Sequence, residues 1–352
     1  MRMVYRALKP LFQLALVLIF FVPAEAGNLK KPFTFQHLTP KDGLSSDMVN
    51  AVAVHGDEVW FGTEGGGATL FDRAKKTFKA YTTKGEPMDA VDKGRSLYWQ
   101  NLLPYNHISV IALDSDRVWF GTYFYGYGGG GISYFNPQKN PAWKKFNTND
   151  SRAKKVVSLA VDGDSLWVGS EKGLSLLDKK TEQWKGFYSS QNGLSGNFVN
   201  ALLLQGDSLW AGTNAGISRF NKTRRTWKAY SEKDGLTEAE IKALIYTGQK
   251  IWAGGAQGTL FEYDPTSDRW KKIDPTDPLK SGGILSLALA KETEKVLVCR
   301  DNGVSVYDLQ SGQWDAISAS DGLTGTMVFS AAEDKDGIWF GTDKGASQLV
   351  LQ

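Results

Sequence analysis

The sequence predicts an all-β fold, a seven-bladed β-propeller of four-stranded blades, and three observations support this prediction. The stretch GDSLWAGTNAGISRF at 206–220 recurs in seven copies, mostly 42 to 48 residues apart. A short run with a second aromatic residue, such as RTWKAY at 225–230, accompanies the copies. The 352 residues include 38 glycines, which suits many tight turns. A period near 40–45 residues with several short strands per unit is typical of propeller blades.

The N-terminal segment has the features of a secretory signal peptide. A basic start at 2–9 precedes an apolar run at 11–22, and Ala24-Glu25-Ala26 supplies a small-x-small cleavage pattern. We expect cleavage after Ala26, so that 1–26 is the signal peptide and 27–352 the propeller. The apolar run is shorter than the roughly 20 residues that span a bilayer, and no later stretch is apolar enough. The mature protein is therefore expected to be periplasmic or secreted, without a membrane span.

The net charge bears on nucleic-acid binding, and the cysteine content bears on disulfide formation. Cleavage would remove three positive charges and one negative charge, which lowers the formal net charge from +3 to +1. A nearly neutral chain gives no reason to expect a nucleic-acid partner. Cys299 is the only cysteine, so no intramolecular disulfide is possible, and we expect a buried, unreactive thiol. The chain is expected to be a monomer without a cofactor.

Each copy of the repeat is expected to form four strands. In the fourth copy, an inner strand at 200–204 is followed by strands at 209–213, 217–220 and 226–230. The glycine after the tryptophan should let backbones approach closely, and the next glycine should supply the positive φ of a turn. In this copy they are Gly212 and Gly216. The first aromatic position holds Trp60, Trp119, Trp167, Trp210, Trp252, Leu297 and Trp339.

The second aromatic position predicts that both faces of each blade are covered. A large apolar residue follows it three positions later, and in a strand that offset places the two side chains on opposite faces. Eleven of the twelve tryptophans occupy one of the two positions, and we expect all eleven in the core between blades. Trp99 is the exception. The second position holds Phe35, Phe78, Trp143, Trp184, Trp227, Trp270 and Trp314.

The ring is expected to be closed by its two termini. The last copy contains only three strands, while an extra outer strand, FTFQHL at 33–38, precedes the first inner strand. Pairing of that strand with the last blade would complete the seventh sheet and cover its open edges.

The repeats resemble the two-component-regulator propeller repeat. The resemblance is carried by the pattern D-x-Φ-W-Φ-G-T-x-x-G, by the later W-x-x-Y, and by DGL at 42–44, 234–236 and 321–323 with NGL at 192–194. It extends over nearly all of 27–352. It implies a sensor module, since such propellers form the extracytoplasmic halves of bacterial hybrid histidine kinases, some of which bind oligosaccharides. No kinase, linker domain or catalytic motif is recognisable within the 352 residues.

Two insertions into the repeat mark a candidate ligand-binding site. They lie at 82–106, between the first and second blades, and at 123–131, in a turn of the second blade, so both should emerge on one face. Aromatic side chains on such loops suit stacking against sugar rings or gripping a peptide, or they pack on one another as a small loop core. These aromatic residues are Tyr98, Trp99, Tyr105, Tyr123, Phe124, Tyr125 and Tyr127.

A polar position shared by the inner strands forms a second candidate. Alternation predicts that these side chains point to the central channel, where they either contact a ligand or only line a hydrated tunnel. Lys242 could meet an anionic group. The residues are Asn50, Ser109, Ser158, Asn200, Lys242, Ser286 and Ser330.

Catalytic residues are not evident. The three histidines, His37, His55 and His107, lack the spacing of a zinc site. His107 adjoins the first insertion and could act as a general base if a carboxylate and a metal lay nearby. The aspartates before the second strands are expected to cap turns at the end opposite the insertions. They are Asp57, Asp116, Asp164 and Asp207.

The function expected from the sequence is non-catalytic binding of an oligosaccharide or similar polar ligand on the face that carries the two insertions. One alternative is a scaffold for protein interactions that partners an envelope signalling protein. Another is a metal-dependent lyase that uses His107.

Overall fold

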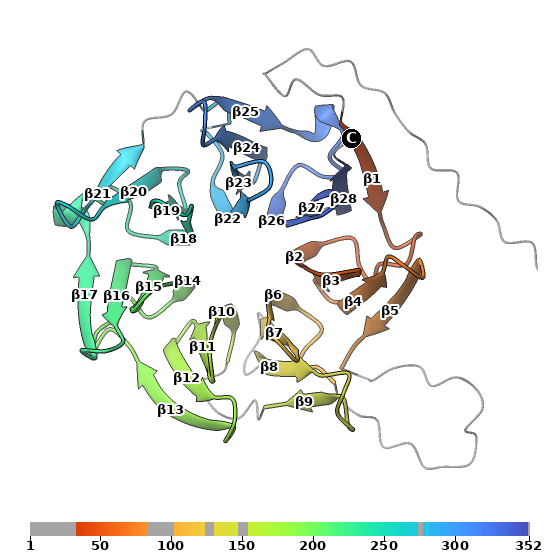
Figure 1. Cartoon of the computed structure of the whole chain (residues 1–352), viewed down its shortest axis with the longest axis horizontal. Coiled ribbons are helices and arrows are strands. Elements are labelled where there is room, and N and C mark those ends of the chain that lie inside the picture. Colours follow the sequence, from red (N-terminus) through yellow and green to blue (C-terminus); the bar gives the residue numbers. More distant parts are fainter. Residues whose placement is uncertain are drawn as a thin grey trace, which may run out of the picture.

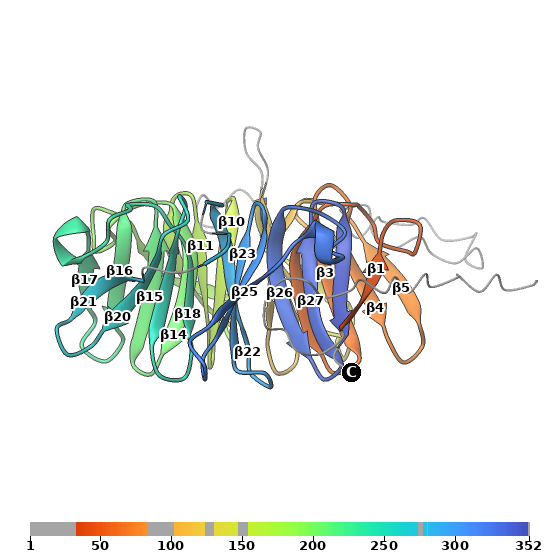
Figure 2. The same ribbon diagram turned by 90° about the horizontal axis from the view of Figure 1, so that it is seen from above.

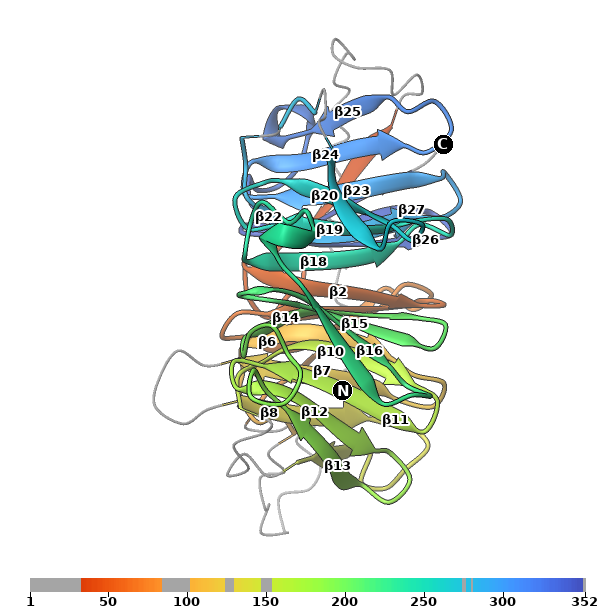
Figure 3. The same ribbon diagram turned by 90° about the vertical axis from the view of Figure 1, so that its left-hand side faces the viewer.

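A computed structural model describes residues 33–83, 102–123, 130–146, 154–273, 277–279 and 281–350. In these residues, 28 strands form seven four-stranded antiparallel sheets, which stand as blades around a central axis (Figure 1). The predicted seven-bladed propeller is confirmed. Edge-on views show the blades side by side, with their strands crossing the thickness of the ring (Figures 2 and 3).

The strands of each blade follow the order of the chain from the axis outward. Blade 1 contains β2 (Val49–His55), β3 (Glu58–Thr63), β4 (Gly67–Asp72) and β5 (Thr77–Tyr81). Blade 2 contains β6 (Ile108–Leu113), β7 (Val118–Tyr123), β8 (Gly130–Phe135) and β9 (Trp143–Lys145). Blade 3 contains β10 (Val156–Asp162), β11 (Ser165–Ser170), β12 (Gly173–Asp178) and β13 (Gln183–Tyr188).

The same order continues around the ring. Blade 4 contains β14 (Val199–Gln205), β15 (Ser208–Thr213), β16 (Gly216–Asn221) and β17 (Thr226–Tyr230). Blade 5 contains β18 (Ile241–Tyr246), β19 (Ile251–Gly255), β20 (Leu260–Asp264) and β21 (Arg269–Ile273). Blade 6 contains β22 (Ile284–Ala290), β23 (Lys295–Arg300), β24 (Gly303–Asp308) and β25 (Trp314–Ile317). Among the described residues, two 3₁₀ helices, η2 (Glu232–Asp234) and η3 (Ala319–Asp321), lie between blades.

Blade 7 joins the two ends of the described chain. It contains β26 (Val328–Asp334), β27 (Gly337–Thr342), β28 (Gly345–Val350) and the N-terminal strand β1 (Thr34–Leu38). β1 pairs antiparallel with β28, from Thr34 opposite Val350 to Leu38 opposite Ala346. The predicted closure of the ring by its termini is confirmed.

The eleven repeat tryptophans all belong to or pack against the apolar clusters between blades, as predicted, and three of them are only partly buried: Trp184, Trp227 and Trp314. Trp60 is fully buried and belongs to one apolar cluster with Phe120 and Trp143 of the next blade. On β17, Trp227 packs against the cluster shared with blade 3, whereas Tyr230 belongs to the cluster shared with blade 5. The offset of three residues therefore covers both faces of a blade.

The predicted glycine roles in blade 4 are also confirmed. Gly216 has φ +113, which an L side chain rarely adopts. Gly212 lies so close to the next blade that a Cβ there would stand 2.9 Å from Cγ2 of Ile241.

The DGL sequences form a compact turn at the junction of two blades. At 231–236, the backbone N–H of Ser231 donates to Oδ2 of Asp234 at 2.9 Å, and Gly235 has φ +102. Leu236 is then buried in the core. A Cβ on Gly235 would lie 1.9 Å from the carbonyl oxygen of Trp270 in blade 5. Only glycine fits both the backbone angle and the space.

We expect Gly235→Ala to destabilise the protein more than Gly206→Ala. Gly206 also has positive φ, +56, but a Cβ added there would have no atom within 4 Å. Gly206→Ala should lower the free energy of unfolding by about 1–2 kcal/mol, the usual cost of this backbone conformation. Gly235→Ala should cost more, because the neighbouring blade must also move. Urea unfolding of both variants checks this, and equal losses would contradict it.

A hydrogen-bond network of hydroxyl groups follows several of these turns. In blade 1, the Ser45 hydroxyl lies 3.1 Å from Oγ1 of Thr63 and accepts from Thr69 at 2.8 Å. Equivalent networks join Ser195, Thr213 and Ser218, and Thr324, Thr342 and Ser347. Each network fastens the segment between two blades to the second and third strands of the following blade.

Blade 6 replaces this network with a buried ion pair. Arg300 stands opposite Ile284, the place that Thr63 holds opposite Val49 in blade 1. Its guanidinium donates to Oδ2 of Asp277 at 2.5 Å, and neither side chain is exposed. Arg300 also donates to the Ser305 hydroxyl and to the carbonyl oxygen of Gly282, at 3.0 and 2.6 Å. One charged pair thus holds the segment before β22 in place.

The two ends of the ring carry different connections. We call the end with the blade-to-blade segments and the turns between second and third strands the insertion face. The other end, with the turns between first and second and between third and fourth strands, is the turn face. At the turn face, one of the four aspartates expected to cap turns, Asp207, caps a different turn from the one in which it lies. Asp207 accepts from the backbone N–H and hydroxyl of Thr223 in the next turn, while Gly206 shapes the first turn.

Cys299 is fully buried on β23. Burial raises the pKa of its thiol to about 12, so the reactive thiolate is scarce at neutral pH. This agrees with the predicted buried, unreactive thiol.

Candidate functional site

The described flanks of the two insertions meet on the insertion face. The backbone N–H of Tyr123, at the end of β7, donates to the carbonyl oxygen of His107 at 3.0 Å. The N–H of Gly67 donates to the carbonyl oxygen of Asn106 at 2.8 Å. The end of the first insertion therefore lies beside the start of the second. Tyr98, Trp99, Phe124, Tyr125 and Tyr127 lie outside the described residues.

The end of the first insertion is anchored in the core. Leu102 and Leu103 are buried in the cluster that also contains Tyr81 and Ile108. The side-chain oxygen of Asn106 accepts from the N–H of Thr83 at 2.7 Å, which joins the two sides of the insertion. Such an anchor gives the side chains beside it a fixed position. Tyr105 is among them and is partly exposed.

Charged groups lie beside Tyr123 and near the end of the first insertion. The ammonium group of Lys155 lies 5.8 Å from the ring centre of Tyr123 and 2.8 Å from a carboxylate oxygen of Glu171. The hydrogen bond to Glu171 raises the pKa of Lys155, which therefore stays charged at neutral pH. Nδ1 of His107 lies 3.7 Å from Oε1 of Glu64. Rings beside charges of both signs suit a ligand with apolar faces and polar edges.

Two predicted channel residues join adjacent blades. The side-chain amide of Asn50 donates to the carbonyl oxygen of Ile108 in the next blade at 3.2 Å, and Asn200 donates to that of Ile241 at 3.0 Å. Lys242 forms an ion pair with Glu240 at 2.5 Å. Each asparagine amide thus donates a hydrogen bond to the neighbouring blade. Lys242, which was predicted to meet an anionic group of a ligand, is already paired with the carboxylate of Glu240.

The shared polar position is corrected by the strand register. Each inner strand has a bulge one residue after its start, and the extra residue is Asn50 in β2, Asn200 in β14 and Lys242 in β18. In β10, β22 and β26 the bulge residues are Val157, Leu285 and Phe329. Ser158, Ser286 and Ser330 therefore lie one residue beyond the position assigned to them. The ring at the channel mouth is partly apolar.

Metal-dependent catalysis gains no support from the described part of the chain. In those residues, no group of three or more His, Cys, Asp or Glu side chains could hold a metal ion. Nδ1 of His107 lies 3.7 Å from a carboxylate oxygen of Glu64.

A cavity at the turn face was missed by the sequence reasoning. It has a volume of about 530 Å³ and lies between blades 5 and 6, next to Trp252 and Tyr307. The sequence did carry a signal. A basic residue follows the third strand in blades 1, 3 and 4, whereas Leu309 follows it in blade 6. A leucine at this position indicates a cavity only once the residue opposite it in blade 5, Thr247, is known.

A comparison with protein families supports the resemblance of the repeats to the two component regulator propeller. Residues 322–344, from the glycine of a DGL turn to the turn after β27, match the family model described as two component regulator propeller. One copy of the repeat, at 322–344, therefore matches this family model. No match was found among curated proteins.

Several solved structures have folds similar to that of this chain. The extracellular domain assigned to the hybrid two component system BT3049 of B. thetaiotaomicron has a TM-score of 0.71 and 19% identity, over 90% of this chain and 42% of that one. The extracellular domain of BT4673 has a TM-score of 0.66 and 20% identity, over 90% of this chain and 40% of that one. The computationally designed Ika8 protein gives 0.58 and 13%, over 87% and 96%. The chain thus spans about two fifths of the two bacterial domains.

Helices capable of crossing a membrane were sought in the described residues, and none is long and apolar enough.

Proposed function

We propose that this chain is an exported, non-catalytic propeller of the sensor type that binds an oligosaccharide or similar polar ligand at its insertion face. The meeting of the two insertion flanks, seen in the hydrogen bond from Tyr123 to His107, is the observation that carries the proposal. The ring of Tyr123, the ion pair of Lys155 with Glu171 and the anchored end of the first insertion therefore lie in one sector of the insertion face. The family match and the extracellular origin of the two bacterial structures support a sensor role.

Binding is favoured over catalysis because the site offers contact surfaces rather than a reactive centre. Tyr123 and Lys155 present a ring face and a charge, which orient a ligand without reacting with it. The group at the rim therefore resembles a recognition site.

A thermal-shift screen with oligosaccharides and peptides, followed by titration calorimetry, tests the proposal. The double variant Trp99→Ala with Tyr125→Ala should weaken binding of any ligand found by at least tenfold, because stacking surfaces are lost. Phe187→Ala, which removes an exposed ring from β13, is the matched control and should leave affinity unchanged. Unchanged affinity in the double variant would place the site elsewhere. Co-purification of an envelope protein without any small-molecule binding would favour the scaffold alternative.

A further inference from the structure

A repeated ion pair fastens neighbouring blades at the turn face. At three junctions, the residue after the third strand of one blade contacts an aspartate at or just after the end of the first strand of the preceding blade. In blades 2 and 5, the residue after the third strand is uncharged, Asn136 and Pro265 respectively. Lys179 pairs with Asp114 at 2.5 Å, and Lys222 pairs with Asp162 at 3.0 Å. Between blades 1 and 7, Arg73 and Asp334 pair at 2.8 Å. We call this pair the blade clamp.

The clamp is replaced by two uncharged residues between blades 5 and 6. Leu309 occupies the cation position, since its backbone N–H donates to the carbonyl oxygen of Glu294. The backbone N–H of Lys179 donates in the same way to the carbonyl oxygen of Asp164. Thr247 occupies the aspartate position, because its N–H donates across its turn to Lys250 as that of Asp114 does to Arg117. Neither residue can form the ion pair of the clamp. The cavity of about 530 Å³ opens at this place.

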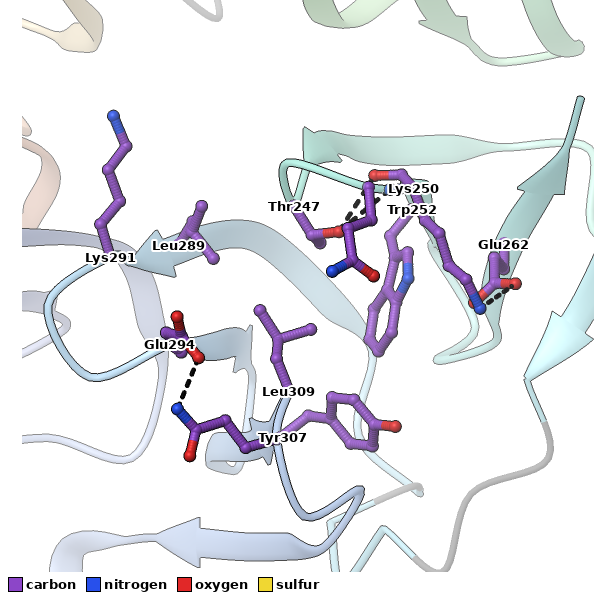
Figure 4. A pocket seen from close by; sticks show the side chains of 11 residues that line it. Thr247, Lys250, Trp252, Glu262, Leu289, Lys291, Glu294, Tyr307 and Leu309 are labelled. Carbon is purple, nitrogen blue, oxygen red and sulfur yellow. Dashed lines mark hydrogen bonds and ion pairs between the residues drawn. The ribbon is translucent and has the colours of Figure 1, made fainter.

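The inner part of the cavity is apolar and aromatic. Figure 4 shows Leu289, Leu309 and Trp252 between the turns of blades 5 and 6. The rings of Trp252 and Tyr307 lie 5.1 Å apart and are tilted by 48°. Trp252 is 3% exposed, and its indole N–H is buried without a hydrogen-bond acceptor among the described residues. A polar ligand that entered could supply an acceptor to that N–H.

The rim of the cavity is polar and electrically balanced. Lys250 and Glu262 form an ion pair at 2.9 Å, and Gln310 donates to Glu294 at 2.7 Å (Figure 4). Lys291 adds a second cation. Two positive and two negative side chains give no net preference for an anion or a cation. Their polar atoms instead offer several donors and acceptors to an uncharged ligand.

We propose that this cavity is a second binding site, for a compact uncharged polar ligand with one apolar face, the chemistry of one or two neutral sugar rings. Ligand cavities typically measure about 300–1,000 Å³ and combine apolar walls with a few polar groups. Both features are present between blades 5 and 6, where the clamp is absent. The site lies on the turn face, away from the insertion face, and its occupation does not depend on the function proposed there.

Rebuilding the clamp tests the proposal directly. The double variant Thr247→Asp with Leu309→Lys reproduces the pair formed by Asp114 and Lys179 and should fill the cavity. Wild-type protein is titrated with glucose, galactose, N-acetylglucosamine, maltose and cellobiose, with glucuronate as a charged comparison. At least one neutral sugar should bind more tightly than glucuronate. The double variant should lose at least tenfold in affinity and keep its thermal midpoint.

Two further variants keep the test decisive. Asp114→Thr with Lys179→Leu removes the clamp between blades 2 and 3 and should leave sugar affinity unchanged. Gln310→Ala alters only the exposed rim, so it remains informative if the rebuilt clamp fails to fold, and it should weaken binding at least threefold. Absence of binding by every neutral sugar would overturn the proposal. So would full affinity in the rebuilt variant, while loss with Trp99→Ala alone would assign binding to the insertion face.

Discussion

Arg300→Met is expected to lower the free energy of unfolding by about 3–5 kcal/mol, the usual result of removing one partner from a buried ion pair. The variant would leave the Asp277 carboxylate without its counter-charge at a place where neither side chain is exposed. Asp277→Asn should be similarly costly, because it strands the guanidinium. Both substitutions nearly preserve side-chain volume, so the loss reports charge rather than a cavity. Urea unfolding followed by tryptophan fluorescence measures both.

The double variant Arg300→Met with Asp277→Asn separates pairing from packing. It removes both charges together, and asparagine keeps an oxygen to accept from Ser305, as Asp277 does at 2.6 Å. Its loss should be smaller than the sum of the two single losses, since neither charge is stranded. Additive losses would show that the two side chains act independently, contrary to the geometry.

Trp60→Ala is expected to cost about 3–5 kcal/mol, as large aromatic truncations in a core do. Trp60 is fully buried, with Tyr81, Phe120 and Phe135 at ring-centre distances of 5.5, 5.2 and 5.5 Å. Because two of these rings belong to blade 2, the truncation would open a cavity between blades. Differential scanning calorimetry or urea unfolding measures the loss.

Phe187→Ala provides the comparison for this truncation. Phe187 lies on an outer strand and is 37% exposed, so its removal should cost less than about 1 kcal/mol. A loss similar to that of Trp60→Ala would mean that outer strands contribute as much as the contacts between blades.

The architecture could be predicted because it depends on features that recur. Trp60, Trp210 and Trp339 occupy the same position in different copies, and repetition distinguishes a blade from an isolated strand. The unpaired outer strand at 33–38 indicated how the ring closes. Gly216 could be assigned because a turn between two short strands commonly needs positive φ.

The candidate sites could be predicted only in part because they depend on departures from the repeat. Asn50 and Val157 occupy equivalent bulge positions in their inner strands. The polar pattern in the sequence instead aligned Asn50 with Ser158, the residue after Val157. The cavity beside Leu309 is lined also by Thr247, 62 positions earlier in the numbering. Neither residue is unusual by itself.

The pairing of β1 with β28 also has a consequence for how the molecule folds. The strand that completes blade 7 comes from the opposite end of the described chain, at Thr34–Leu38. Forming this sheet closes a loop of nearly the whole polypeptide, which carries a larger entropic cost than the hairpins within one blade. We therefore expect the first six blades to assemble from local hairpins, with blade 7 the last to form.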